Sequence, residues 1–419
     1  MKRFAMTILA FALPAASCSG PTQDQLKQAA WDCRERNYDA PEAITACDRL
    51  LTQHPAADQE AVYLAARGVG HARVGQDEQA KTDIDAALAI EPRLTTARLQ
   101  RAKLAEKTGD LASAKADYDQ ALAEGPWLVD GLIGRARLEL ESGDNAGAIR
   151  DLSEAVKLRP ERGDAWLLLG TAHRRAGDMA AAAHDYGEAI KLRPEEANVR
   201  LARAAALMQL GDYPAALADA DAAIKLAPSS AEAYNQRGRI EAASGQLDQA
   251  IADFTRSVEL DPGLADAYRY RGNAQVQKGN LDAAIADFTL AIERAPDLAS
   301  AYVGRADALA KKGQDAAALK DFDEAVRLDP QNAVGFVARG NVLVRLNRAE
   351  AAVASFDRAI ALSPGLASAY YGRGRANLLL GRDQQARTDF VEALRLEPKM
   401  EAAQRQLDNL ARAAAARQT

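Results

Sequence analysis

Small, apolar and turn-forming residues recur along this chain with a period of 34 residues. Ten prolines mark the period, at positions 92, 126, 160, 194, 228, 262, 296, 330, 364 and 398. When each proline is placed at position 32 of a unit, the units begin at Ala61, Thr95, Val129, Gly163, Ala197, Ala231, Ala265, Ala299, Ala333 and Ala367. A fixed period of this length predicts stacked repeats, in place of the two or three globular domains that 419 residues would otherwise suggest.

Each unit carries the pattern of two helices joined by a short turn. Position 15 is glycine in nine units and asparagine (Asn347) in the tenth, and these residues best tolerate the left-handed backbone that ends a helix. Position 20 is alanine in all ten units and position 8 is always glycine or alanine, so that two helices can approach closely. Pro41 and Pro214 fall at position 18, where a second helix would begin and a missing N–H costs nothing. Since helix-forming residues also dominate the composition, we expect an all-α chain.

An aromatic residue at position 24 completes a pattern that resembles the tetratricopeptide repeat. Position 24 is aromatic in seven units, and these residues are Tyr118, Tyr186, Phe254, Phe288, Phe322, Phe356 and Phe390. With small residues at positions 8, 20 and 27 and proline at 32, the resemblance extends from about residue 24 to residue 400. It implies a right-handed superhelical solenoid of helix-turn-helix repeats that ends in a capping helix, with the first helices lining a concave groove for peptides or partner domains.

The spacing also predicts where the array begins and ends. A divergent first repeat is expected over residues 24–60, because Pro55 lies 37 residues before Pro92 and three extra residues fall near Ala57 to Gln59. Ten regular repeats are expected over residues 61–400. Residues 401–419 are expected to form a capping helix and tail, whose polar side would carry Gln404, Arg405, Asp408 and Arg412.

Two charged positions depart from the usual pattern of the family. Position 7 is arginine in nine of ten units and position 23 is aspartate in nine of ten, the exceptions being Leu169 and Ser355. We expect these residues to form ion pairs between the two helices, within a repeat or across to the next. Semi-buried pairs of this kind define register more reliably than they stabilise a fold. A row of ligand-binding arginines is the alternative.

The first residues are typical of an export signal. Lys2 and Arg3 precede an apolar run from Phe4 to Ala16, which is too short to span a membrane permanently. Residues 1–17 are therefore expected to be a signal peptide, followed by a tether over residues 18–23. The sequence before Cys18 resembles a bacterial lipobox, which implies lipidation of Cys18 and a periplasmic protein anchored to the outer membrane. A secreted periplasmic protein without lipid and a retained membrane anchor remain alternatives.

Lipidation of Cys18 would leave one pair of cysteines. Cys33 and Cys47 lie 14 residues apart, each expected on one helix of the first hairpin. An oxidising compartment favours a disulfide between them. Two free thiols buried in the helix packing are the alternative.

Charge and motifs argue against several classes of function. A net charge of −6, with 27% charged residues of both signs, gives no field that would attract nucleic acid. The four histidines form no zinc-binding helix pair, and no glycine-rich phosphate loop is present. Gly372-Arg373-Gly374 lacks the next glycine of a dinucleotide fingerprint. We therefore expect no enzyme activity, no metal and no cofactor.

The resemblance implies that positions 2, 5, 9, 12 and 13 of the first helices line the groove. Position 5 is apolar in the N-terminal half, which predicts a contact stripe for an apolar partner segment unless neighbouring helices cover it. Polar residues replace the stripe toward the C-terminal half. The expected partner-binding residues are Leu99, Lys103, Ile133, Arg137, Leu167, Leu201, Asn235, Arg239, Arg269, Asn273, Asn341 and Arg375.

These features predict a non-catalytic scaffold or adaptor of the bacterial cell envelope that binds partner proteins or peptides. A receptor for a glycan or a peptidoglycan fragment is the alternative, which aromatic stacking platforms in the groove would favour. A clamp for chaperone tails is not expected, because Gly304 and Ala338 stand where further polar residues would be needed. The oligomeric state stays open.

Overall fold

The computed structural model describes residues 29–30, 32–33 and 40–416. Within these residues the chain forms 22 α-helices and no strand, so the expected all-α fold is confirmed. The predicted signal peptide, the tether with Cys18 and the last three residues of the tail lie outside the described residues. None of the described helices is both long enough and apolar enough to span a membrane.

The chain divides into two compact units, residues 1–178 and 179–419. The first unit contains α2 (Ala40–Leu51), α3 (Ala57–Arg73), α4 (Asp77–Ile90), α5 (Thr95–Thr108), α6 (Leu111–Glu124), α7 (Val129–Ser142), α8 (Asn145–Leu158) and α9 (Gly163–Arg175). The second unit contains α10 (Met179–Leu192), α11 (Ala197–Gln209), α12 (Tyr213–Leu226), α13 (Ala231–Ala243), α14 (Leu247–Leu260), α15 (Ala265–Lys278), α16 (Leu281–Arg294), α17 (Ala299–Lys311), α18 (Asp315–Leu328), α19 (Ala333–Arg345), α20 (Ala349–Leu362), α21 (Ala367–Leu379), α22 (Asp383–Leu396) and α23 (Glu401–Ala416).

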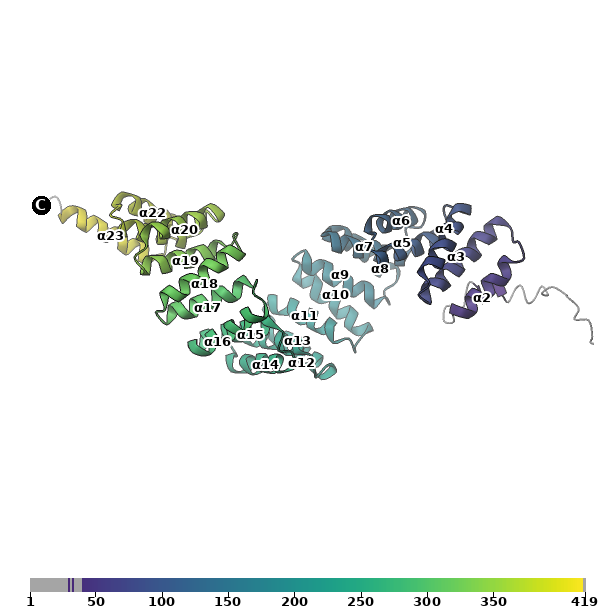
Figure 1. Ribbon diagram of the computed structural model, residues 1–419, viewed down its shortest axis with the longest axis horizontal. Helices are drawn as coiled ribbons and strands as arrows, with labels where there is room; N and C mark the ends of the chain where they lie inside the picture. The colour runs from purple at the N-terminus through teal and green to yellow at the C-terminus, as the bar shows by residue number, and fades with distance from the viewer. Residues whose placement is uncertain (1–28, 31, 34–39, 417–419) are drawn as a thin grey trace, which may run out of the picture. The chain divides into compact units, whose positions relative to one another are not determined.

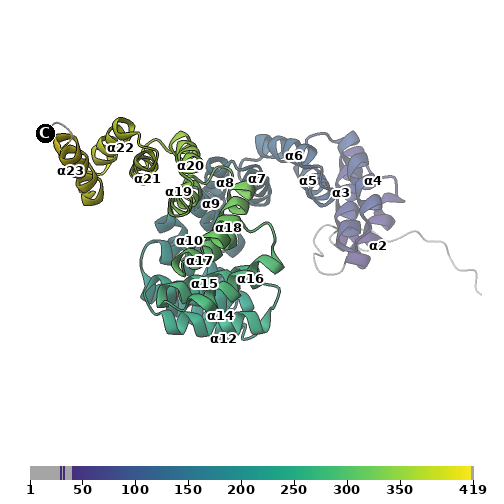
Figure 2. The same cartoon turned by 60° about the vertical axis from the view of Figure 1, so that its left-hand side comes forward.

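Inside each unit, successive helices pack side by side as antiparallel pairs (Figure 1). Each first helix packs against the second helix of its own pair, and that second helix packs against the next first helix (Figure 2). First helices of successive pairs also touch, as α3 does with α5 and α15 with α17. The first helices therefore line one side of the stack in contact with one another, and the groove is expected on this side.

The first helices begin where the 34-residue spacing predicts, with one exception. Nine of them start at the first residue of a unit, from Thr95 to Ala367. Helix α3 instead begins at Ala57, because Ala56 after Pro55 has extended backbone (φ −60°, ψ 150°) and the helix starts directly afterwards. The three extra residues of this repeat thus lengthen its first helix at the N-terminal end.

The turn inside each repeat uses a left-handed residue. Nine glycines at position 15 have φ between 68° and 88°, and Asn347 has φ 57° in the remaining unit. This is the conformation that glycine and asparagine adopt at least cost. In several repeats an aspartate then caps the N-terminus of the second helix. The side chain of Asp110, for example, accepts a hydrogen bond from the backbone amide of Ser113.

The aromatic ring at position 24 fills the space between two first helices. Phe288 is fully buried, and a Cβ added at Gly272 of its own repeat or at Gly304 of the next would overlap its ring. Phe356 lies in the same way between Gly340 and Gly372. The small residues thus allow the close helix packing that makes the stack continuous.

The predicted ion pairs are present and extend in both directions. In eight repeats the arginine at position 7 pairs with the aspartate at position 23 of the same repeat, as Arg135 does with Asp151 at 2.6 Å. Most of these arginines also reach the preceding repeat, where Asp119 lies 2.9 Å from Arg135. In the repeat that has serine in place of the aspartate, Nη1 of Arg339 donates a hydrogen bond of 2.5 Å to Oγ of Ser355. Most of these arginines therefore fix the packing of two neighbouring repeats.

The expected capping helix is α23. Ala403 is buried against α22, and Leu407 and Leu410 pack on the same cluster. The predicted polar side is exposed and carries Gln404, Arg405, Asp408 and Arg412.

Candidate partner-binding groove

The N-terminal hairpin is closed by a disulfide. Cys33 and Cys47 are joined as predicted, with Cα atoms 5.0 Å apart, and both residues are buried. Ala46 and Leu50 of α2 pack in the same cluster. The disulfide therefore holds the residues that form one wall of the groove at its N-terminal end.

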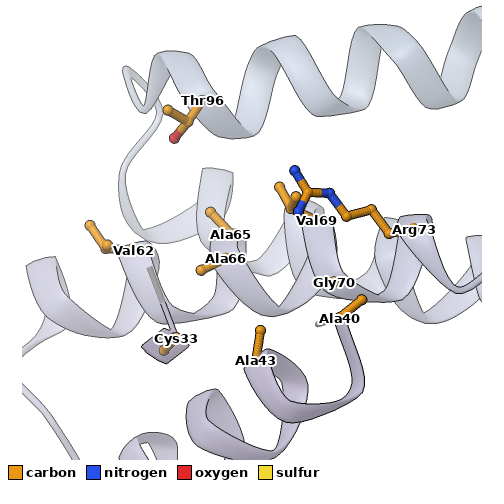
Figure 3. A pocket seen from close by; sticks show the side chains of 10 residues that line it. All are labelled: Cys33, Ala40, Ala43, Val62, Ala65, Ala66, Val69, Gly70, Arg73 and Thr96. Carbon is orange, nitrogen blue, oxygen red and sulfur yellow. The ribbon is translucent and has the colours of Figure 1, made fainter. Parts of the chain in front are cut away.

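A pocket of about 320 Å³ opens at this end of the groove (Figure 3). Helix α3 lines it with Val62, Ala65 and Val69, which stand at positions 2, 5 and 9 of the first regular repeat. Small residues from the hairpin and Thr96 from α5 complete the wall, and Arg73 at position 13 supplies the guanidinium at its side. The side chains of these positions thus converge on one mostly apolar cavity.

The predicted apolar stripe at position 5 is only partly accessible. Leu99 is 9% exposed and Ile133 is 2% exposed, so the prediction of an exposed stripe is wrong for these two residues. Neighbouring helices cover them: Leu99 packs with Ala102 and Tyr118, and Ile133 belongs to the core around α7 and α8. Leu167 and Leu201 are half-buried and remain the candidates of this column.

Two predicted cations in the first unit are paired with acids of neighbouring repeats. Lys103 lies 3.6 Å from Asp130, and Arg137 lies 3.0 Å from Glu106. Both cations are exposed at their ends. Their charge is therefore largely balanced within the protein.

In the second unit four predicted groove residues lie near one another on α13 and α15. The guanidinium carbon of Arg269 lies 3.9 Å from the ring centre of Tyr270, and that of Arg239 lies 5.0 Å from the same ring centre. Asn235 and Asn273 are half-buried on the same two helices. The ring of Tyr270 in turn stacks on Phe254, with centroids 5.9 Å apart. We call Arg239, Arg269 and Tyr270 the arginine–tyrosine cluster.

The last two predicted residues lie farther along the second unit. Asn341 on α19 and Arg375 on α21 are both half-buried. Arg375 lies 5.9 Å from the ring centre of Tyr371. Neither residue belongs to the arginine–tyrosine cluster.

Sequence reasoning missed several groove residues. Val62, Val69 and Arg73 stand at positions 2, 9 and 13 of the first regular repeat, and these columns, which the family resemblance assigns to the groove, would have found them. Tyr270 and Gln236 stand at position 6, outside the columns considered. Position 6 is glycine in three other repeats, so the large polar side chain of Gln236 at this position was the available signal.

Two buried glutamates also escaped sequence analysis. Burial first, and then the charge of the nearby Asp151, raise the pKa of Glu139 to about 7. Burial and Asp253 raise the pKa of Glu241 to about 7 in the same manner. Both stand at position 11 of a first helix, on the side that faces the ion pairs. Among the described residues, no group of three or more histidine, cysteine or acidic side chains is arranged to hold a metal ion.

A model of the tetratricopeptide repeat matches residues 133–198, 201–265, 269–333 and 337–403. The chain belongs to the tetratricopeptide repeat family. Repeats of this family commonly act as scaffolds that bind other proteins or peptides. No curated protein matches the sequence significantly.

Solved tetratricopeptide structures resemble the whole chain or part of it. The Cut9–Hcn1 hetero-tetramer of APC/C is 16% identical, covers 93% of this chain and 93% of its own, and gives a TM-score of 0.50. Yeast Tom70 is 19% identical over 94% of this chain and 97% of its own, with a TM-score of 0.46. YrrB, a protein with an unusual peptide-binding site, is 22% identical over 44% of this chain and 96% of its own, with a TM-score of 0.40. At these identities the likeness concerns the fold.

Proposed function

We propose that this tetratricopeptide protein is a non-catalytic scaffold of the bacterial cell envelope that binds an extended segment of a partner protein along its first helices. The observation that carries the proposal is the N-terminal pocket, because Val62, Ala65 and Val69 stand at the positions assigned to the groove. A mostly apolar cavity of this size accepts an apolar side chain of a partner.

The cellular location in this proposal rests on the N-terminal sequence. Lys2, Arg3 and the apolar run to Ala16 are typical of an export signal, and the disulfide fits an oxidising compartment. Lipidation of Cys18 would place the scaffold at the membrane surface. The partners would then be other proteins of the envelope.

Site-specific photo-crosslinking in cells tests the binding surface. A photoreactive phenylalanine analogue at Val69 should form covalent adducts with a partner, because its side chain lines the pocket. The same analogue at Thr82, which is exposed on the second helix α4, is the matched control. Adducts from Thr82 but not from Val69 would contradict the proposed groove, and no adduct from either position would contradict partner binding by this part of the chain.

A further inference from the structure

Most arginines at position 7 connect their repeat to the one before it. The guanidinium reaches the side chain at position 25 of the preceding repeat, as Arg237 reaches Asp221 at 2.6 Å. We call this contact the arginine bridge. Among the described residues it also joins Arg67 to Asp48, Arg101 to Asp85, Arg135 to Asp119, Arg271 to Thr255, Arg305 to Thr289, Arg339 to Asp323 and Arg373 to Asp357. Because these contacts are directional, they fix the register of the two repeats that they join.

The two interfaces without an arginine bridge flank one repeat, the fourth regular repeat, residues 163–196. On its N-terminal side Leu169 replaces the arginine, and a leucine side chain has no donor for Ser153 at position 25 of the preceding repeat. On its C-terminal side Arg203 is present, but position 25 is Gly187, which has no side-chain acceptor. Nη1 of Arg203 lies 3.3 Å from the place of a Cβ at Gly187. The guanidinium therefore faces position 25 here too, and only the acceptor is missing.

Other contacts hold these two interfaces with less directional constraint. Leu169 is 4% exposed and packs with Leu152 and Ala172 in the core around α7, α8 and α9. Apolar contact is not directional, so it keeps helices together without fixing their register as an ion pair does. Gly187 also lies inside α10, where glycine leaves the backbone more freedom than any other residue. Both features loosen the same repeat.

We infer that the fourth regular repeat is a compliant joint of the array, at which successive helices shift against each other more easily than elsewhere. The two missing bridges flank this repeat, and the division of the chain into compact units after residue 178 falls inside it. The bridged repeats before and after it confine the movement to this place. The inference concerns the mechanics of the array and holds whether or not the groove binds the partner proposed above.

Distances between spin labels test the inference in the purified protein. One pair of labels replaces Arg150 and Ala218, which are exposed at position 22 of the repeats before and after the compliant joint. The control pair replaces Ala252 and Lys320, which are exposed at the same position and span one bridged repeat. The labels are attached to ketone-bearing residues, so the native cysteines stay unchanged. We expect the distance distribution of the first pair to be at least about twice as wide as that of the control pair.

Restoring the missing acceptor should narrow the distribution of the first pair. Gly187→Asp supplies Arg203 with the acid that position 25 carries in several other repeats, so the width should fall toward that of the control pair. Gly187→Ala is the matched variant, because it raises helix propensity without adding an acceptor, and it should narrow the distribution little. Equal narrowing by the two variants would overturn the role of the missing bridge.

Removing bridges from the control span should have the opposite effect. Thr255→Val combined with Thr289→Val keeps the branched shape of both side chains but removes the hydroxyl groups that Arg271 and Arg305 contact. The distribution of the control pair should then widen, and an unchanged width would contradict a stiffening role of the bridges. Equal widths of the two label pairs in the wild-type protein would overturn the compliant joint. None of these results bears on partner binding, which the photo-crosslinks test separately.

Discussion

Equally buried carboxyl groups in this protein favour different protonation states because their hydrogen-bond partners differ. Asp151 accepts two hydrogen bonds from Arg135, whereas Glu139, one helix away, has an oxygen that is buried without any partner. Glu241 has the same unpartnered oxygen beside Asp253. A buried carboxylate without a partner is more stable as the neutral acid. The two glutamates therefore make the stability of the repeats dependent on pH.

Replacing both glutamates with glutamine should stabilise the protein at high pH. The pKa of each glutamate rises from 4.5 to about 7 on folding, so the stability is fully present below the unfolded value and falls as the pH rises through 7. In Glu139→Gln with Glu241→Gln the free energy of unfolding near pH 8 should exceed that of wild type by about 1–3 kcal/mol per site, with a higher thermal midpoint, and both should be similar to wild type near pH 5. Circular dichroism melts at both pH values measure this. Equal stabilisation at both pH values would refute the ionisation argument, and exposed Glu141→Gln is the control.

Removing one partner of an ion pair between positions 7 and 23 should destabilise the protein strongly, whereas replacing both partners by apolar residues should destabilise it little. Arg271→Leu leaves Asp287 buried without its bidentate partner, and we expect a loss of about 3–5 kcal/mol. Adding Asp287→Ala should restore most of that loss, since no unpaired charge then remains buried. Urea unfolding of the two single variants and the double variant gives the coupling energy. A double variant less stable than Arg271→Leu would contradict this, because Asp287 would then stabilise the fold without its arginine partner.

At the scale of helices, the size of the residue at position 24 is matched by the size of the residue at position 6 of the next repeat. Phe288 lies between Gly272 and Gly304, whereas the repeat with Ala220 at position 24 is followed by Gln236 at position 6. The space left by the smaller residue is thus taken by a larger one on the next first helix. Packing at this interface is decided by pairs of residues and not by single positions.

Gly304→Ala should destabilise the protein although alanine favours helix. The new methyl group would overlap the ring of Phe288, and overpacking typically costs about 1–3 kcal/mol. Gly335→Ala is the matched control, because its nearest neighbouring atom lies 3.4 Å from the added Cβ and the gain in helix propensity should prevail. Thermal melts of both variants should move in opposite directions. Phe288→Leu combined with Gly304→Ala should recover part of the loss.

Reducing the Cys33–Cys47 disulfide should loosen the N-terminal hairpin and the pocket together. The chain-entropy estimate for a loop of this length is about 3 kcal/mol, and Cys33 itself lines the pocket. Amide hydrogen exchange should become faster in α2 after reduction and stay unchanged in α21 and α22. Mass mapping without reductant should show the two cysteine peptides joined. Two alkylatable thiols in the exported protein would contradict this.

At the scale of the whole molecule, stability is a sum of contacts between neighbours. Within each unit of described residues, the helix pairs make their main contacts with the pairs next to them, so a change in one repeat acts on adjacent repeats. A polar surface on α23 closes the C-terminal end of the stack. Unfolding of such an array need not be a single cooperative transition, and local probes are therefore needed for each prediction above.

The proposed lipid anchor predicts where the whole protein fractionates. With Cys18 acylated, the protein should sediment with membranes, and Cys18→Ser should release it into the soluble periplasmic fraction. Because Cys18 is the proposed attachment point of the lipid, its substitution should abolish the membrane association. Membrane association that Cys18→Ser leaves unchanged would contradict lipidation at this residue.

The sequence by itself determined the number, length and order of the helices, because proline, glycine and alanine at fixed spacing encode local geometry. Gly109 and Asn347 adopt the left-handed backbone that follows the end of a helix, and this conformation is set by the residue itself and not by distant contacts. The pairing of Arg135 with Asp151 followed from two columns of opposite charge. Even the exception at α3 follows from the three extra residues after Pro55.

Tertiary structure alone decided which groove residues are accessible and which charges are balanced. Leu99 and Leu167 occupy the same position in the repeat, yet only Leu99 is buried, because neighbouring helices differ in their side chains. Gln236, Arg239 and Tyr270 come together across two helices, and Glu139 loses its solvent without gaining a partner. Such properties depend on the volumes and charges contributed by adjacent repeats, and a pattern read along one column does not contain them.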